Sequence, residues 1–165
     1  MSENLPLFID GEFTQSKSDT HLEVLNPASQ EILTKVPFAT EEESNRAIAS
    51  AEKTFHDWKD VPPPERSRLM IAYQNLLKKH HEDIAETLSK ENGKNFEDSK
   101  GDVWRGIEVV EQASNIAPLL MGETVGNVAR GIDAYSYLQP LGVCGGITPF
   151  NFPAMVPLWM FPMAI

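Results

Sequence analysis

An asparagine stands in an otherwise apolar stretch near the end of the chain. Asn151 lies between Phe150 and Phe152, and Pro153 follows. An uncharged amide donor in a dry apolar cleft can stabilise the negative charge that develops on a substrate oxygen. Asparagine is equally favoured as the cap of a following helix. The residues alone leave both interpretations open, and the position of Asn151 before a predicted helix favours the cap.

A second candidate for chemistry is Arg105. Asp102 precedes it by three residues and Glu108 follows it by three. Such neighbours can form ion pairs on a helix surface, which contribute little to stability when they are solvated. Alternatively, the planar guanidinium can bind a substrate carboxylate through two parallel hydrogen bonds. Spacing alone favours the ion pairs.

Other reactive residue types give weaker signals. Cys144 is the only cysteine, and its apolar neighbours predict a buried thiol with no histidine nearby in sequence to activate it. We therefore do not expect Cys144 to act as a nucleophile. His80 and His81 lack a second pair of ligands at a zinc-like spacing, so we predict no metal site.

The elements around Asn151 indicate where a ligand would bind. Residues 141–147 are small and apolar, which predicts a strand buried on both faces, as in parallel sheets covered by helices. Residues 148–151 then form a loop, and Phe152 and Pro153 open a helix. In open α/β sheets, ligands bind beyond the carboxyl ends of the strands. The loop is therefore the expected binding position, although its glycines do not match G-x-G-x-x-G.

The preceding part of the chain predicts short strands followed by helices. Four short apolar segments bounded by turn residues predict a small antiparallel meander: 7–9, 12–13, 22–25 and 31–36. Thr40 and Glu43 form a capping-box signature for a helix ending near Trp58. Helical spacing then predicts a helix from Pro64 to Asn92 and another over residues 96–117. In residues 132–139 the larger and smaller side chains alternate between two faces, with Tyr135 and Tyr137 on the same face. This pattern predicts a strand able to lie on a partner's sheet.

Composition excludes several classes of function. With 14 Lys+Arg against 24 Asp+Glu, the net charge of −10 argues against binding nucleic acid or an anionic membrane. No charged residue follows Asp133, yet the apolar end of the chain is too short to span a bilayer. This apolar segment must be buried against other residues, so we expect the sequence to be the first part of a longer protein. The first residues lack a targeting pattern, which predicts a cytoplasmic protein, with the mitochondrial matrix as the alternative.

The stretch Pro140-Leu-Gly-Val-Cys-Gly-Gly-Ile-Thr-Pro-Phe-Asn-Phe-Pro153 resembles the N-terminal signature of the NAD(P)-dependent aldehyde dehydrogenase superfamily. Earlier segments agree: Ile9-Asp-Gly-Glu12, Asn26-Pro27 and Glu91-Asn-Gly-Lys94. Two further segments are similar to the CoA-acylating methylmalonate-semialdehyde dehydrogenase branch: Gly101–Glu108 and Pro149–Pro162. The resemblance extends over nearly the whole chain.

The resemblance implies an α/β fold, namely the N-terminal part of an aldehyde dehydrogenase. It would contain short antiparallel strands, helices, an assembly strand and the first strand and helix of a Rossmann-like parallel sheet. Residues 1–131 would be the N-terminal strands and helical layer, 132–140 the oligomerisation strand, and 141–165 the start of the NAD-binding core.

The resemblance also implies roles for individual residues. Thr148, Pro149, Phe150 and Asn151 would contact NAD. Asn151 would donate to the oxyanion of the reacting aldehyde, which makes capping the weaker interpretation. Phe152 and Trp159 would line the aldehyde tunnel, and Arg105 would hold the substrate carboxylate.

The implied reaction oxidises a carboxylated aldehyde with NAD, releases carbon dioxide and transfers the acyl group to coenzyme A, a co-substrate. The implied assembly is a homodimer or homotetramer. The nucleophilic cysteine and the glutamate of the family are expected beyond Ile165, and Cys144 does not match that cysteine, so we expect the 165 residues alone to be inactive. The alternatives are a non-catalytic fragment or decayed gene product, or an aldehyde dehydrogenase of other specificity.

Overall fold

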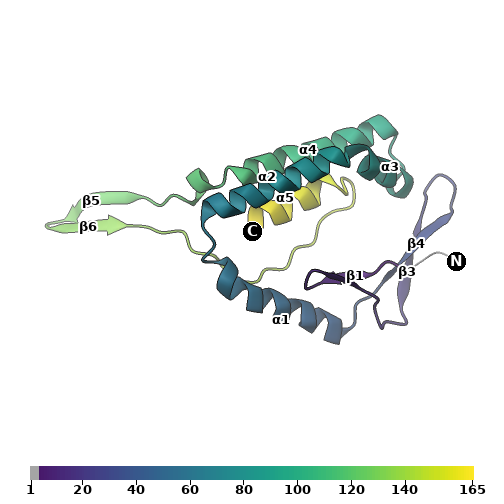
Figure 1. Ribbon diagram of the computed structural model, residues 1–165, viewed down its shortest axis with the longest axis horizontal. Coiled ribbons are helices and arrows are strands. Elements are labelled where there is room, and N and C mark those ends of the chain that lie inside the picture. The colour runs from purple at the N-terminus through teal and green to yellow at the C-terminus, as the bar shows by residue number, and fades with distance from the viewer. Residues whose placement is uncertain (1–3) are drawn as a thin grey trace.

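The computed structural model describes residues 4–165, which form helices and three separate two-stranded sheets (Figure 1). The strands are β1 (Leu7–Ile9), β2 (Glu12–Thr14), β3 (His21–Leu25), β4 (Ile32–Pro37), β5 (Thr124–Ala129) and β6 (Ile132–Tyr135). The helices are α1 (Glu41–Trp58), α2 (Pro63–Lys79), α3 (His81–Asn92), α4 (Phe96–Ser114), the 3₁₀ helix η1 (Ala117–Leu120) and α5 (Met155–Ala164).

The four N-terminal strands form two hairpins instead of one meander. In the first, Asp10 and Gly11 both adopt positive φ angles of 59° and 78°, as the Asp-Gly turn predicts. Among the strands of residues 4–165, β1 pairs only with β2, and β3 pairs only with β4. The segment between the hairpins bonds to α1 instead, because the Glu43 carboxylate accepts from the Lys17 backbone N–H (2.8 Å) and the Ser16 hydroxyl (3.0 Å).

The helix boundaries confirm most of the capping signals. Thr40 caps α1 through the predicted reciprocal bonds with Glu43, and Gly93 ends α3 with a φ of 81°. The single helix predicted from Pro64 to Asn92 is in fact α2 and α3. The break falls at His80, whose backbone leaves the helical region (φ −105°, ψ 19°) and whose Nδ1 lies 3.0 Å from Asp83 Oδ2 in the first turn of α3.

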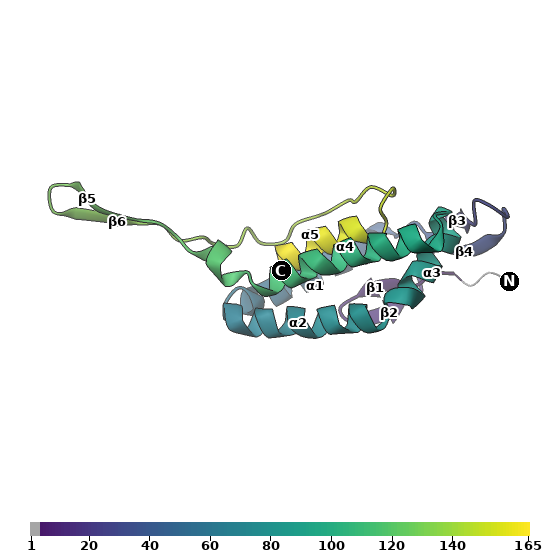
Figure 2. The same ribbon diagram turned by 90° about the horizontal axis from the view of Figure 1, so that it is seen from above.

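Helix α4 is the centre of the core. It contacts α2, α3 and α5, and the two views show α4 and α5 side by side (Figures 1 and 2). Val103, Ile107 and Val110 lie on one face of α4 and are buried. Helices α4 and α5 run parallel and approach closely at Gly106, where a methyl group would lie 2.5 Å from Leu158 Cδ1.

The hairpin β5–β6 projects away from the helices (Figure 2). All its residues are exposed. The strand predicted over residues 132–139 ends at Tyr135, and its partner β5 was not predicted from the sequence. No helix among residues 4–165 is long and apolar enough to cross a membrane.

The strand predicted over residues 141–147 is absent from the structure. The segment is extended but unpaired, and Leu141 and Ile147 are almost fully exposed. A strand requires hydrogen-bonding neighbours, and residues 4–165 place no strand beside this segment. Cys144 is consequently exposed, contrary to the predicted burial.

Candidate functional site

The loop that carries Asn151 is attached, on either side of that residue, to the end of α3 and to the short segment that joins α3 to α4. Before it, the side-chain amide of Asn92 donates to the Phe150 carbonyl oxygen at 3.1 Å. After it, the Lys94 ammonium lies 4.0 Å from the centre of the Phe152 ring, a cation–π geometry. The two residues on either side of Asn151 are thus held, Phe150 through its backbone and Phe152 through its ring.

Asn151 does not cap α5, so the capping interpretation is wrong. The N-cap residue is Ala154, whose side chain accepts no hydrogen bond from the first N–H groups of α5. Asn151 is exposed, and within residues 4–165 its amide has no hydrogen-bond partner. Its donor groups are therefore available to a ligand.

The ion pairs considered for Arg105 are also absent. Arg105 is exposed, and neither Asp102 nor Glu108 pairs with its guanidinium within the described chain. Its backbone carbonyl accepts from Trp159 Nε1 at 3.2 Å, which joins α4 to α5. The structure therefore brings together two predicted substrate-binding residues, and it leaves the guanidinium free to bind an anion.

Sequence reasoning missed Asp102 as part of this region. Its side chain is fully buried, its Oδ2 lies 2.6 Å from the Lys94 ammonium, and its Oδ1 accepts from the Met155 backbone N–H at 2.8 Å. The helical spacing could have predicted its burial, because Asp102 lies one helical turn from Ser99 and Gly106, which are also buried. A carboxylate on that face needs a partner.

The predicted NAD-contacting residues form the exposed side of the loop. Thr148 is half-buried, Pro149 is exposed, and Phe150 exposes 87% of its surface. Residues 148–151 carry no charged side chain, so the loop itself offers no cation to the phosphates of a dinucleotide. Contact between NAD and Thr148, Pro149, Phe150 or Asn151 remains a prediction.

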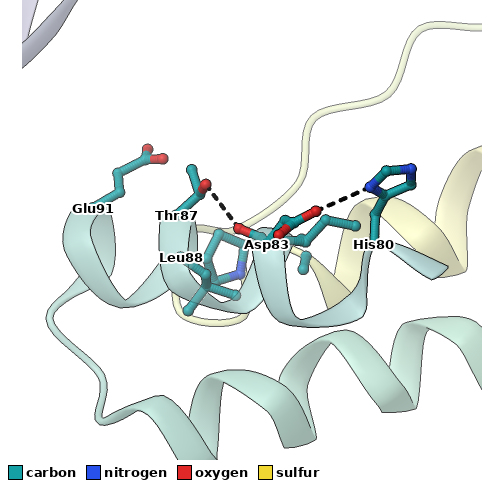
Figure 3. A pocket seen from close by; sticks show the side chains of 8 residues that line it. His80, Asp83, Thr87, Leu88 and Glu91 are labelled. Carbon is teal, nitrogen blue, oxygen red and sulfur yellow. Dashed lines mark hydrogen bonds and ion pairs between the residues drawn. The ribbon is translucent and has the colours of Figure 1, made fainter. Parts of the chain in front are cut away.

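A shallow pocket of about 440 Å³ lies between α3 and the start of α5 (Figure 3). None of the predicted NAD- or substrate-binding residues lines this pocket. The residues that line it are His80, Asp83, Ile84, Thr87, Leu88, Glu91, Pro153 and Ala154. His80 bonds to Asp83, and His81 Nε2 lies 2.8 Å from the Lys100 carbonyl oxygen. Residues 4–165 contain no group of three or more His, Cys, Asp or Glu side chains that could bind a metal ion.

Comparison with known proteins identifies the family. The aldehyde dehydrogenase family model matches residues 13–165. Malonate-semialdehyde dehydrogenase 1 of Geobacillus kaustophilus is 49% identical over 96% of the chain, which covers 32% of that protein. The human methylmalonate-semialdehyde/malonate-semialdehyde dehydrogenase (acylating, mitochondrial) is 48% identical over 96% of the chain, which covers 30% of it.

Solved structures agree. Methylmalonate-semialdehyde dehydrogenase from Oceanimonas doudoroffii superimposes with a TM-score of 0.93 at 41% identity, over 99% of this chain and 33% of its own. A Sinorhizobium meliloti structure in complex with NAD gives 0.92 at 38% identity, over 98% and 33%. The chain spans about a third of the length of the relatives it matches. It belongs to the aldehyde dehydrogenase family.

Proposed function

We propose that this chain forms the N-terminal part of an NAD-dependent, CoA-acylating dehydrogenase of malonate or methylmalonate semialdehyde. The observation that carries the proposal is the exposed guanidinium of Arg105, which has no partner within residues 4–165, on a residue whose backbone carbonyl binds Trp159. Semialdehydes of this class carry a carboxylate, and a planar guanidinium binds a carboxylate through two parallel hydrogen bonds. The names of the relatives support the same substrate class.

The residues of this chain bind and orient the substrate. Arg105 holds the carboxylate end, and Phe152 and Trp159 line the approach of the aldehyde. Asn151 donates its amide to the oxygen of the attacked carbonyl, where an uncharged donor stabilises the developing negative charge. Cys144 is not the nucleophile that attacks the carbonyl. The nucleophile belongs to the remainder of the full-length enzyme.

Thr148, Pro149, Phe150 and Asn151 bind the nicotinamide end of NAD. NAD, when bound, supplies the acceptor for the hydride that leaves the aldehyde carbon. The NAD complex of the Sinorhizobium meliloti structure supports this cofactor, and the acylating human relative supports coenzyme A as co-substrate. The exposed, projecting hairpin β5–β6 (Figure 2) supports assembly into a homo-oligomer.

The test is Arg105→Leu in a full-length enzyme that contains this sequence. We expect KM for malonate semialdehyde to rise at least about 10-fold, because each charge-assisted hydrogen bond that is lost contributes about 1.5–3 kcal/mol. KM for propanal, which lacks the carboxylate, should change less than twofold. Arg68→Leu, an exposed arginine on α2, is the matched control. Equal effects of Arg105→Leu on the two aldehydes would refute the assignment.

The acyl acceptor is tested separately. We expect product release from the full-length enzyme to accelerate when coenzyme A is added, with acyl-CoA as the product. An enzyme that forms only the free acid at any coenzyme A concentration would be an aldehyde dehydrogenase of another specificity. A full-length protein that binds NAD but oxidises neither aldehyde would be non-catalytic.

A further inference from the structure

Three side chains outside the loop that carries Asn151 hold this loop in place. Asn92 and Lys94 flank the glycine that ends α3, and Asp102 lies on α4. The first bonds to the Phe150 carbonyl, the second lies over the Phe152 ring, and the third binds the first backbone N–H of α5. The three contacts fall on Phe150, Phe152 and Met155, on both sides of Asn151.

Asp102 replaces a missing helix cap. Helix α5 begins after Ala154, which has no side-chain oxygen, so its first N–H groups lack the usual local acceptor. Asp102 supplies that acceptor from the neighbouring helix, at 2.8 Å from the Met155 nitrogen. A carboxylate at a helix N-terminus also interacts favourably with the helix dipole. The start of α5 is therefore fixed to α4.

Lys94 connects this buried carboxylate to the loop. Its ammonium is 2.6 Å from Asp102 Oδ2 and 4.0 Å from the centre of the Phe152 ring. Only 21% of the Lys94 side chain is exposed, so this charge has little freedom to move. One lysine thus links the buried face of α4 to the residue that directly follows Asn151.

We propose that Asn92, Lys94 and Asp102 are positioning residues that fix the direction of the Asn151 amide. This inference rests on the proposed role of Asn151 as donor to the aldehyde oxygen. The three residues do not contact the substrate. They act on the reaction only through the backbone on either side of Asn151, and catalytic donors lose much of their effect when they are displaced by about 1 Å.

The test is a double-mutant cycle on kcat in a full-length enzyme that contains this sequence. Asn151→Ala should lower kcat about 100-fold or more, as for loss of one oxyanion donor. Asn92→Ala should lower kcat about tenfold and leave KM for NAD within twofold. In the Asn151→Ala background, Asn92→Ala should lower kcat by less than twofold, because no donor remains to be positioned. Asn75→Ala, an exposed asparagine on α2, is the control.

The outcomes separate this inference from the proposed function. If Asn151→Ala leaves kcat unchanged, the proposed function fails. If Asn151→Ala lowers kcat but Asn92→Ala has no effect, or its effect is equal in both backgrounds, the positioning role fails. Amide hydrogen exchange gives a readout independent of activity. Asn92→Asp, which keeps the shape but loses the donor, should accelerate exchange in residues 150–155 several-fold, and unchanged exchange would overturn the inference.

Discussion

The buried pair between Asp102 and Lys94 makes a large and specific prediction about stability. Asp102→Ala removes the acceptor of the Met155 N–H and the partner of the Lys94 ammonium in one step. A buried donor that loses a charged acceptor costs about 1.5–3 kcal/mol. Breaking a fully buried ion pair costs about 3–5 kcal/mol. Lys94 keeps a fifth of its surface exposed, so water can solvate part of its charge and lowers the second figure.

We therefore expect Asp102→Ala to lower the free energy of unfolding by about 3–5 kcal/mol. Asp102→Asn should lose less, because the amide oxygen still accepts from the Met155 N–H while the ion pair is gone. The assay is urea unfolding followed by circular dichroism. With a slope of about 2 kcal/mol/M, the midpoint of Asp102→Ala should fall by about 1.5–2.5 M.

The control is Asp57→Ala, which removes an exposed carboxylate of α1 without a side-chain partner in residues 4–165. Such surface changes usually alter the free energy of unfolding by less than about 0.5 kcal/mol. A loss of less than about 1 kcal/mol for Asp102→Ala would refute the reasoning. So would equal losses for the Ala and Asn variants, because they would show that the bond to α5 contributes nothing.

Two further predictions concern packing and pH. Gly106→Ala should destabilise the protein by about 1–3 kcal/mol in urea unfolding, because the new methyl group would lie 2.5 Å from Leu158 Cδ1. Gly101→Ala on the same helix has open space and should stabilise it by about 0.5–1 kcal/mol; equal effects of the two would contradict the packing. Hydrogen bonds from the backbone N–H groups of Thr40 and Lys17 lower the pKa of Glu43 from 4.5 to about 2. The stability that this carboxylate contributes should be complete above about pH 5 and be lost as pH falls towards 2. The difference in the free energy of unfolding between wild type and Glu43→Gln should therefore narrow in acid. The control variant Glu41→Gln should show no such trend.

The sequence predicts elements well where the signal is local. The Asp10-Gly11 turn, the capping box of Thr40 and the glycine after α3 all depend on residues a few positions apart, and the structure confirms them. The break at His80 was missed because the apolar spacing continues through it. The interruption depends on one backbone conformation, which the apolar pattern does not report.

Long-range partners were harder to predict. Residues 141–147 have the composition of a buried strand, but a strand forms only where another strand supplies its hydrogen bonds. The role of Asp102 likewise depends on Lys94 and Met155, which lie 8 and 53 residues away. For Asn151 and Arg105, the residue types indicated possible chemistry, and the structure removed the competing interpretations by showing neither a cap nor an ion pair.

The contact between α4 and α5 explains why substrate recognition and oxyanion stabilisation belong together in this proposal. Arg105 lies on the outer side of α4, and its carbonyl is bound to Trp159 of α5. Asp102, one turn earlier, binds the start of α5 and so the end of the loop that carries Asn151. A displacement of α5 along α4 would therefore move the loop that carries Asn151 relative to Arg105. Gly106 packs closely against Leu158, which lies on α5 between Met155 and Trp159, so the spacing of the two sites depends on a residue that touches neither ligand.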